Sequence, residues 1–224
     1  SIKAVYERAG VLRTHDGAEG SLTMIGTVSP SGGNFEEPVT QSTLATVKTF
    51  LGLSADRAYK RFYPAVDPLI SWSRYMDQLT PWLERELGEG WPTRVREMLE
   101  LLNHGERVRQ MMAVTGEEGV TLEDFVTNQK ALFVDMVYLQ QDAFDKVDAS
   151  APLSRQRQTF DLVHDAVTRA SHFADKEAAR GHFTHLTGLF KNLNYSSEQG
   201  PDFPRYLREI TAALEAAMPP PVPE

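Results

Sequence analysis

The spacing of apolar side chains divides the chain near residue 75. Before that point, apolar residues come in short runs broken by Gly, Ser, Thr and Pro. Segment 20–30 (GSLTMIGTVSP) alternates apolar and polar positions, as a strand does. The turn-rich HDGAEG, which follows Leu12, predicts that this strand is the second arm of a hairpin. Segment 29–41 is rich in residues that interrupt regular structure, and it is predicted to be a loop.

The region between this loop and residue 75 gives shorter signals. Segment 43–53 (TLATVKTFLGL) fits a helix or a strand equally well. Ser54 is a good N-cap residue, so a short helix is predicted to begin after it. Pro64 and Pro68 stand four residues apart in YPAVDPL and forbid a helix across them. We therefore expect an extended or turned, conformationally restricted backbone there.

After residue 75 the apolar positions follow a helical period. Thr80 as N-cap and Pro81 at the first helical position predict one helix, and Pro92 predicts the start of the next. Segment 115–124 is predicted to be a turn between two helices, because it contains a capping box (TLED) with Asp in place of the usual Glu. The apolar faces predicted on either side of this turn are Val95, Met98, Leu99 and Leu102, and then Phe125, Leu132, Met136 and Leu139.

Two later segments have cleaner helical periodicity, with Gly181 and segment 194–204 predicted as interruptions between them. Their apolar residues are Phe160, Val163, Val167, Ala170 and Ala174, and then Phe203, Tyr206, Leu207, Ile210 and Leu214. The pattern predicts an α+β fold that is mainly α. Residues 1–74 would hold a short hairpin and strands, residues 75–217 a helical bundle, and residues 218–224 (MPPPVPE) a disordered Pro-rich tail.

Composition narrows the class of protein. The 224 residues are 41% hydrophobic, which is enough for a real core. A net charge of −8 argues against a nucleic-acid partner. The absence of cysteine excludes disulfides and thiolate metal sites. No apolar run is long enough to span a bilayer, and the start SIKA lacks the features of a signal peptide. Since the chain starts without Met and at once has a helical pattern, we expect that it was cut from a larger protein.

The residues alone provide no complete active site. The sequence has no phosphate loop of the form GxxxxGK[ST], no GxSxG, no HExxH and no cysteine nucleophile. His182 and His185 could share a helix face, but no acid stands at ligand spacing, so exposed helix histidines are expected rather than a metal site. The SGG at 31–33 could bind phosphate through its backbone N–H groups, although a short glycine loop is a weak signal.

Longer motifs resemble a known family. Segment 20–82 resembles the catalytic A subunit of rotary V/A-type ATPases, which carries a V-S-P-P-G-G-D-F-S-E-P-V-T-Q loop and then an L-A-x-R-R-x-F-P-A segment. Segment 138–148 (YLQQDAFDKVD) is similar to that family's F-L-Q-Q-N-A-F-x-x-V-D. The likeness runs from about Ala4 to about Leu214. Ser31 and Asn34 depart from the loop motif, Tyr63 stands where Phe is common, and YPAVDPL is also similar to the F-type β subunit.

The resemblance implies a role in nucleotide binding. It places Tyr63 against the adenine ring and makes the segment from Tyr138 to Phe144 the second adenine wall. ATP or ADP with Mg²⁺ would be the cofactor of the intact subunit. The family's phosphate loop, catalytic Glu and Mg²⁺-binding acids lie upstream of this segment, so no catalytic residue or metal ligand is expected here, and neither bound nucleotide nor activity in this chain alone. The alternative is that the rings of Tyr63, Tyr138 and Phe144 are core aromatics that join the two parts of the chain.

The resemblance also implies partners. Segment 94–133 resembles the helix-turn-helix that faces the central rotor stalk, and its tip carries Glu117, Glu118, Glu123 and Asp124 with no Lys or Arg between them. The tip would contact the rotor, or it is simply a solvated turn. Segment 29–34 would lie near the phosphates, at the interface with the non-catalytic B subunits. Arg74 is expected to be structural, because the family's arginine finger comes from the B subunit.

Taken as a whole, the resemblance implies a subunit that couples ATP hydrolysis or synthesis to rotor rotation and to H⁺ or Na⁺ transport. It would be cytoplasmic and peripheral to the membrane, without direct membrane insertion. Two alternatives stay open at this point. One is the corresponding part of an F-type β subunit or of a secretion-system ATPase. The other is a non-catalytic helical interaction module derived from such an ATPase.

Overall fold

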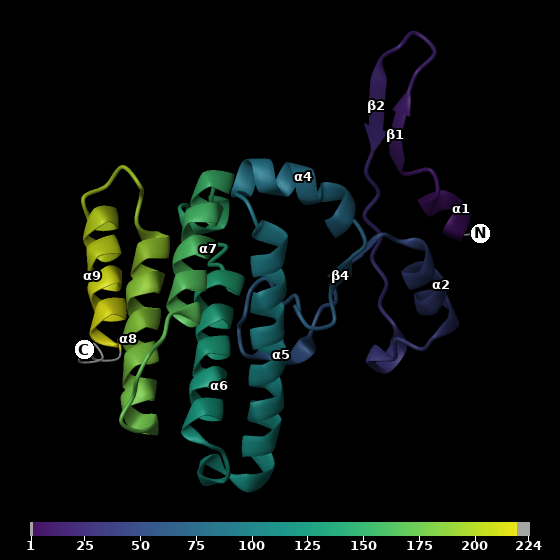
Figure 1. The fold of residues 1–224 in the computed structure, drawn as a ribbon. Coiled ribbons are helices and arrows are strands. Elements are labelled where there is room, and N and C mark those ends of the chain that lie inside the picture. The colour runs from purple at the N-terminus through teal and green to yellow at the C-terminus, as the bar shows by residue number, and fades with distance from the viewer. Residues whose placement is uncertain (1, 219–224) are drawn as a thin grey trace.

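The computed structural model describes residues 2–218 and consists of a thin N-terminal part and a larger helical part (Figure 1). The chain begins with α1 (Ile2–Tyr6) and the antiparallel hairpin of β1 (Gly10–Arg13) and β2 (Glu19–Leu22). The predicted hairpin is thus confirmed, but the strand predicted to reach residue 30 ends at Leu22. Alternation marks a strand only where a neighbouring strand completes the hydrogen-bond ladder, and β1 is short.

The segments that follow the hairpin include a second small sheet. A 3₁₀ turn, η1 (Ser31–Gly33), precedes α2 (Pro38–Thr46), so the loop prediction for 29–41 is wrong from Pro38 onward. Pro38 takes the first helical position, where its missing N–H is not needed. The ambiguous segment 43–53 ends α2 and then forms β3 (Thr49–Phe50), which pairs with β4 (Trp72–Ser73).

The connection between β3 and β4 contains α3 (Ala55–Tyr59). Ser54 caps α3 as predicted, because its hydroxyl oxygen accepts the backbone N–H of Arg57 at 3.3 Å. The backbone between Pro64 and Pro68 is not helical, as predicted, and Val66 forms an isolated antiparallel bridge with Leu53. The segment after α3 is therefore paired with the segment that precedes α3.

The helical part confirms the mainly α prediction. Its helices are α4 (Met76–Leu87), α5 (Trp91–Thr115), α6 (Leu122–Val134), α7 (Leu153–Thr168), α8 (Lys176–Tyr195) and α9 (Asp202–Ala216). The shorter turns are η2 (Glu117–Gly119), the π-helical η3 (Asp135–Leu139) that continues α6, and η4 (Asp148–Ser150). Helices α5, α6, α8 and α9 pack in a row, and the turn between α5 and α6 forms the tip of the long hairpin (Figure 1).

Three helix boundaries differ from the prediction. α4 starts at Met76, so Pro81 lies inside it, and the Thr80 hydroxyl donates to the Met76 carbonyl oxygen at 2.9 Å instead of capping. Gly181 lies inside α8. α7 ends at Thr168, before Ala170 and Ala174. Single Pro or Gly residues weaken a helix by a few kcal/mol at most, and the burial of a helix face can outweigh that loss.

The core is built from the helical part. Its most buried large side chains include Phe125, Phe133, Phe190, Leu186, Leu193, Ile210, Val134, Val137 and Val163. Two predicted face residues, Leu99 and Leu132, are instead exposed, at 36% and 45%. Helices α5 and α6 approach closely at Gly105, where an added Cβ would lie 2.2 Å from the Cβ of Ala131. We attribute the outward position of both leucines to this contact, which fixes how each helix is rotated.

The N-terminal part buries far less apolar surface. Exposed apolar residues there include Val11, Leu12, Leu22, Ile25, Leu51 and Leu53. Most of the predicted tail, residues 219–224, lies outside the described residues. Within residues 2–218, no helix combines the length and the apolar character needed to cross a bilayer.

Candidate functional site

The two segments expected on the nucleotide side lie against each other. The backbone N–H of Gln141 donates to the carbonyl oxygen of Tyr63 at 2.6 Å. The Gln140 side chain donates to the carbonyl oxygen of Arg61 at 3.3 Å. The structure therefore joins Tyr63 to the segment 138–144 through the main chain, although the two are far apart in the sequence.

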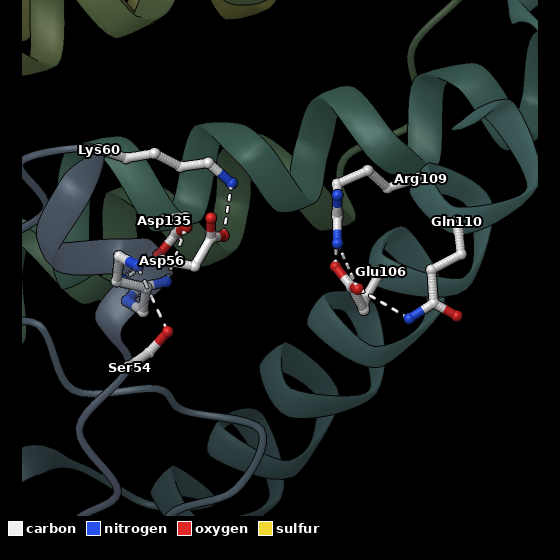
Figure 2. A network of polar contacts seen from close by, with 8 residues as sticks. Ser54, Asp56, Lys60, Glu106, Arg109, Gln110 and Asp135 are labelled. Atoms are coloured by element: carbon white, nitrogen blue, oxygen red, sulfur yellow. Dashed lines mark hydrogen bonds and ion pairs between the residues drawn. The ribbon is translucent and has the colours of Figure 1, made fainter. Parts of the chain in front are cut away.

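An ion pair anchors the same junction. The Arg57 guanidinium donates through Nη1 and Nη2 to the two carboxylate oxygens of Asp135, at 3.0 and 2.6 Å. The side chains are only 13% and 21% exposed, and the Arg57 Cζ lies 5.0 Å from the centre of the Phe62 ring. Figure 2 draws Asp135 at this junction together with Ser54, whose hydroxyl oxygen accepts the backbone N–H of Arg57. The sequence carries no signal for this pair, whose members are 78 positions apart.

Two of the three predicted adenine contacts have exposed rings. Tyr63 is 50% exposed and Phe144 is 97% exposed. The loop that carries Phe144 is stiffened by its own acids: Asp142 accepts the Phe144 N–H, and Asp145 accepts the N–H groups of Val147 and Asp148, each at 2.9 Å. Both rings could therefore meet a flat ligand without rearrangement of the core.

Tyr138 has a different environment. Its ring packs against Phe160 with ring centres 5.4 Å apart. Burial raises the pKa of Tyr138 to about 12, with a further contribution from the charge of Asp161. A phenol held in this way has the surroundings of a core aromatic.

The other residues considered from the sequence take structural positions. His182 is partly buried, so the expectation of exposed histidines holds only for His185. Its ring lies 5.2 Å from that of Phe173, and burial, followed by the charge of His185, lowers its pKa. The Arg74 guanidinium lies 4.8 Å over the Trp72 ring, which fits the structural role expected for it. Residues 2–218 contain no group of three or more His, Cys, Asp or Glu that could hold a metal ion.

Two backbone N–H groups at the glycine turn 31–33 already donate to carbonyl oxygens of the same turn. The Gly33 N–H donates to the Pro30 carbonyl oxygen at 3.1 Å, and the Asn34 N–H donates to the Ser31 carbonyl oxygen at 3.2 Å. Donors committed to a 3₁₀ turn cannot at the same time point at a phosphate. The N–H groups of Gly33 and Asn34 are therefore not available to a phosphate in the turn as it stands.

The acidic tip between α5 and α6 is partly neutralised by α8. Glu117 accepts two hydrogen bonds from Arg180 Nη2, at 2.6 and 2.8 Å. Lys176 Nζ donates to the carbonyl oxygens of Glu117 and Val120, at 2.6 and 2.7 Å. The sequence places no cation between the tip acids, but the fold brings these two from about sixty positions away.

Of the remaining tip acids, one bonds to the residue that caps a helix and two face solvent. Thr121 caps α6 as predicted, since its hydroxyl oxygen accepts the Asp124 N–H at 3.1 Å and its hydroxyl donates to the Asp124 carboxylate at 2.9 Å. Glu118 and Glu123 are exposed, and Val114 beside them is 87% exposed. The tip thus presents two exposed carboxylates and an apolar side chain on a turn that Lys176 and Arg180 tie to α8.

Comparison with known proteins agrees with this layout. Residues 1–73 match the family "ATP synthase alpha/beta family, nucleotide-binding domain", and residues 80–177 match "C-terminal domain of V and A type ATP synthase". The boundary between the two matches falls close to residue 75, where the hydrophobic pattern changes.

Curated proteins named "V-type ATP synthase alpha chain" match nearly the whole of this chain. The V-type ATP synthase alpha chain of Chlamydia pneumoniae is 44% identical over 217 residues, which is 97% of this chain and 36% of that protein. The alpha chain of Protochlamydia amoebophila is 42% identical over 214 residues, again 36% of its length. The chain thus spans about a third of the length of these curated relatives.

A solved structure supports the fold alone. The structure described as a unique ATP synthase subunit NeqB from Nanoarcheaum equitans superposes with a TM-score of 0.60 at 20% identity. It covers 74% of this chain, and the match is 40% of that subunit. By sequence and by its two matched domains, the chain is similar to the V-type ATP synthase alpha chains along nearly all of its own length.

Proposed function

We propose that this chain forms the C-terminal part of the catalytic subunit of an ion-translocating V/A-type ATPase or ATP synthase. It would couple ATP hydrolysis or synthesis to rotor rotation and so to H⁺ or Na⁺ transport. The observation that carries the proposal is the junction at which Tyr63 and segment 138–144 meet, in a chain 44% identical to a V-type ATP synthase alpha chain. The match to the V/A C-terminal domain favours this type over the F-type β subunit and secretion ATPases.

The nucleotide contact would be made by the exposed rings at this junction. Tyr63 and Phe144 would stack on the adenine of ATP or ADP, and Tyr138 would support the segment from the core side. Mg²⁺ and the phosphates would be held by parts of the subunit outside these 224 residues, which contain no GxxxxGK[ST]. Stacking supplies roughly 1–3 kcal/mol per base, which is too little for measurable affinity alone. The chain by itself would therefore neither hydrolyse ATP nor hold it.

The adenine contact is tested at Tyr63 in the full-length subunit within its complex. We expect Tyr63→Ser to weaken ATP binding by about 5- to 150-fold, the equivalent of the ~1–3 kcal/mol that stacking supplies. Tyr63→Phe keeps the flat ring and should leave the affinity within about twofold of the wild type. The measurement is the Kd for MgATP together with the KM of hydrolysis. Equal effects of the two substitutions, or no effect of Tyr63→Ser, would contradict the proposed contact.

The helical part would serve as the lever that links this site to the rotor. Helices α5 and α6 form a long antiparallel hairpin whose tip is fastened to α8 by Lys176 and Arg180. Such a fastening would make the hairpin and α8 move together. Glu118, Glu123 and Val114 would make the contact with the central stalk, and the B subunits would cover the exposed apolar surface of residues 1–74. The complex would be peripheral to the membrane on its cytoplasmic side.

The tip contact is tested by reversing only the acids that the fold leaves free. We expect Glu118→Lys combined with Glu123→Lys to reduce ATP-driven rotation relative to ATP hydrolysis in the assembled complex, because the contact would lose its charge complementarity. The control reverses Glu89 and Glu198, which are also exposed but lie at connections outside the tip. Rotation that is unchanged by the tip pair, or equally reduced by both pairs, would argue against a rotor contact here.

A further inference from the structure

The ion pair between Arg57 and Asp135 connects two segments that otherwise belong to different parts of the chain. Arg57 lies in α3, and Asp135 is the first residue of the π-helical turn η3. The guanidinium meets both carboxylate oxygens, at 3.0 and 2.6 Å. A two-point contact of this kind fixes orientation as well as distance. The pair therefore determines how α3 is set on the end of α6.

Each member of the ion pair lies in the sequence shortly before one of the two segments of the proposed nucleotide contact. Tyr63 follows shortly after the end of the helix that carries Arg57, and the segment 138–144 follows Asp135. The two main chains meet again where the Gln141 N–H donates to the Tyr63 carbonyl oxygen at 2.6 Å. The ion pair and this hydrogen bond are thus two ties between the same two segments.

Stability alone is a poor explanation for the pair. A largely buried ion pair adds little net stability compared with apolar side chains of similar size, and its best-attested use is to fix register. The Arg57 Nε is buried and has no hydrogen-bond partner among residues 2–218, so the pair is not fully satisfied. The π turn that it holds is also fastened from the other side, where Asn194 donates to the Val137 carbonyl oxygen at 2.8 Å. Turns of this type occur often at functional sites.

We propose that Arg57 and Asp135 are positioning residues, which hold the Tyr63 segment against segment 138–144 and thereby set the affinity of the site for the adenine end of a nucleotide. The first half of this inference concerns only the chain itself. The second half rests on the proposed function. Two experiments separate them.

The first experiment uses amide hydrogen exchange on the 224-residue chain and needs no nucleotide. We expect Arg57→Met to accelerate exchange of the Gln141 amide at least about tenfold, while the Phe190 amide in the core of α8 changes less than about twofold. The exchanged pair Arg57→Asp with Asp135→Arg should restore part of the protection. Arg57→Lys keeps the charge without the two-point contact and should give an intermediate rate, which provides a milder variant if Arg57→Met folds poorly.

The matched control is another ion pair of α3. Lys60 contacts Asp56 at 2.6 Å, but these side chains are 54% and 72% exposed (Figure 2). Lys60→Met should therefore leave the Gln141 amide unchanged. If Arg57→Met leaves Gln141 protected, or if it accelerates Gln141 and Phe190 equally, the pair has no positioning role.

The second experiment uses the full-length subunit in its complex. We expect Arg57→Met to raise the KM for ATP about tenfold with a change in kcat below about twofold, because the segments that hold the base would be displaced while the phosphates stay bound elsewhere. If Tyr63→Ser weakens ATP binding but Arg57→Met does not, the positioning inference fails and the proposed function stands. If Tyr63→Ser also has no effect, the proposed adenine contact fails, and the exchange experiment alone decides the structural half.

Discussion

Replacement of Arg155 by alanine is expected to destabilise the chain by about 3 kcal/mol. Arg155 is 5% exposed and projects from α7 to the end of α8. Its guanidinium donates to the carbonyl oxygens of Leu193, Asn194 and Ser196, at 2.7, 3.0 and 2.8 Å. The last carbonyls of a helix have no partner within the helix, and a cation there also interacts favourably with the helix dipole. Alanine would remove the guanidinium from these partly buried oxygens, and the Leu193 oxygen would keep only the Ser196 N–H, at 3.0 Å.

The measurement is urea unfolding of the 224-residue chain followed by circular dichroism. Arg155→Lys keeps the charge but loses the planar fork, so an intermediate loss is expected. Arg157→Ala is the matched control, since that side chain is 47% exposed, and it should change the free energy of unfolding by less than about 0.5 kcal/mol. If Arg155→Ala and Arg157→Ala had equal effects, the cap would contribute nothing to stability.

Replacement of Phe190 by alanine is expected to have the largest effect on the core, a loss of about 3–5 kcal/mol. Phe190 is fully buried in α8, and its ring meets that of Phe133 edge to face with centres 5.0 Å apart. The substitution removes apolar contact area and leaves a cavity between α6 and α8 that the packed helices can fill only in part. Since whole domains are stable by only about 5–15 kcal/mol, a large share of the stability would be lost.

Phe144→Ala is the control for Phe190→Ala, because it removes the same type of side chain from an exposed position. Phe144 is 97% exposed, so we expect its removal to change the unfolding free energy by less than about 0.5 kcal/mol. Urea unfolding of both variants checks the comparison. A stability loss at Phe144 similar to that at Phe190 would mean that Phe144 is a structural residue, and it would remove the reason to assign it to a ligand.

Local signals were reliable where one turn of chain decides the outcome. Ser54 caps α3 and Thr121 caps α6, as their side chains predict. The hairpin before residue 23 and the turn between α5 and α6 also follow from the sequence. In each of these cases the side chain that carries the signal bonds to atoms within a few residues, and no distant contact overrides it, in contrast to Thr80.

Single breaker residues and apolar faces were less reliable, because packing competes with them. Pro81 and Gly181 lie inside helices, since α4 packs on α5 and α8 is buried on both sides of the glycine, at Ala179 and Phe183. Leu132 satisfies the helical period but is exposed. A period shows that a helix has an apolar face, but the neighbouring helix decides which part of that face is covered.

The sequence by itself determined the mainly α character of the chain, the change near residue 75 and the resemblance to V/A-type ATPase subunits, because these depend on residue order alone. Only the tertiary structure decided the pairs that define the candidate site: Arg57 with Asp135, Tyr63 with Gln141, and Arg180 with Glu117. A charged side chain finds its partner by position in space. Segments 60 to 80 residues apart leave no local trace of meeting, so these contacts appear only once the helices have packed.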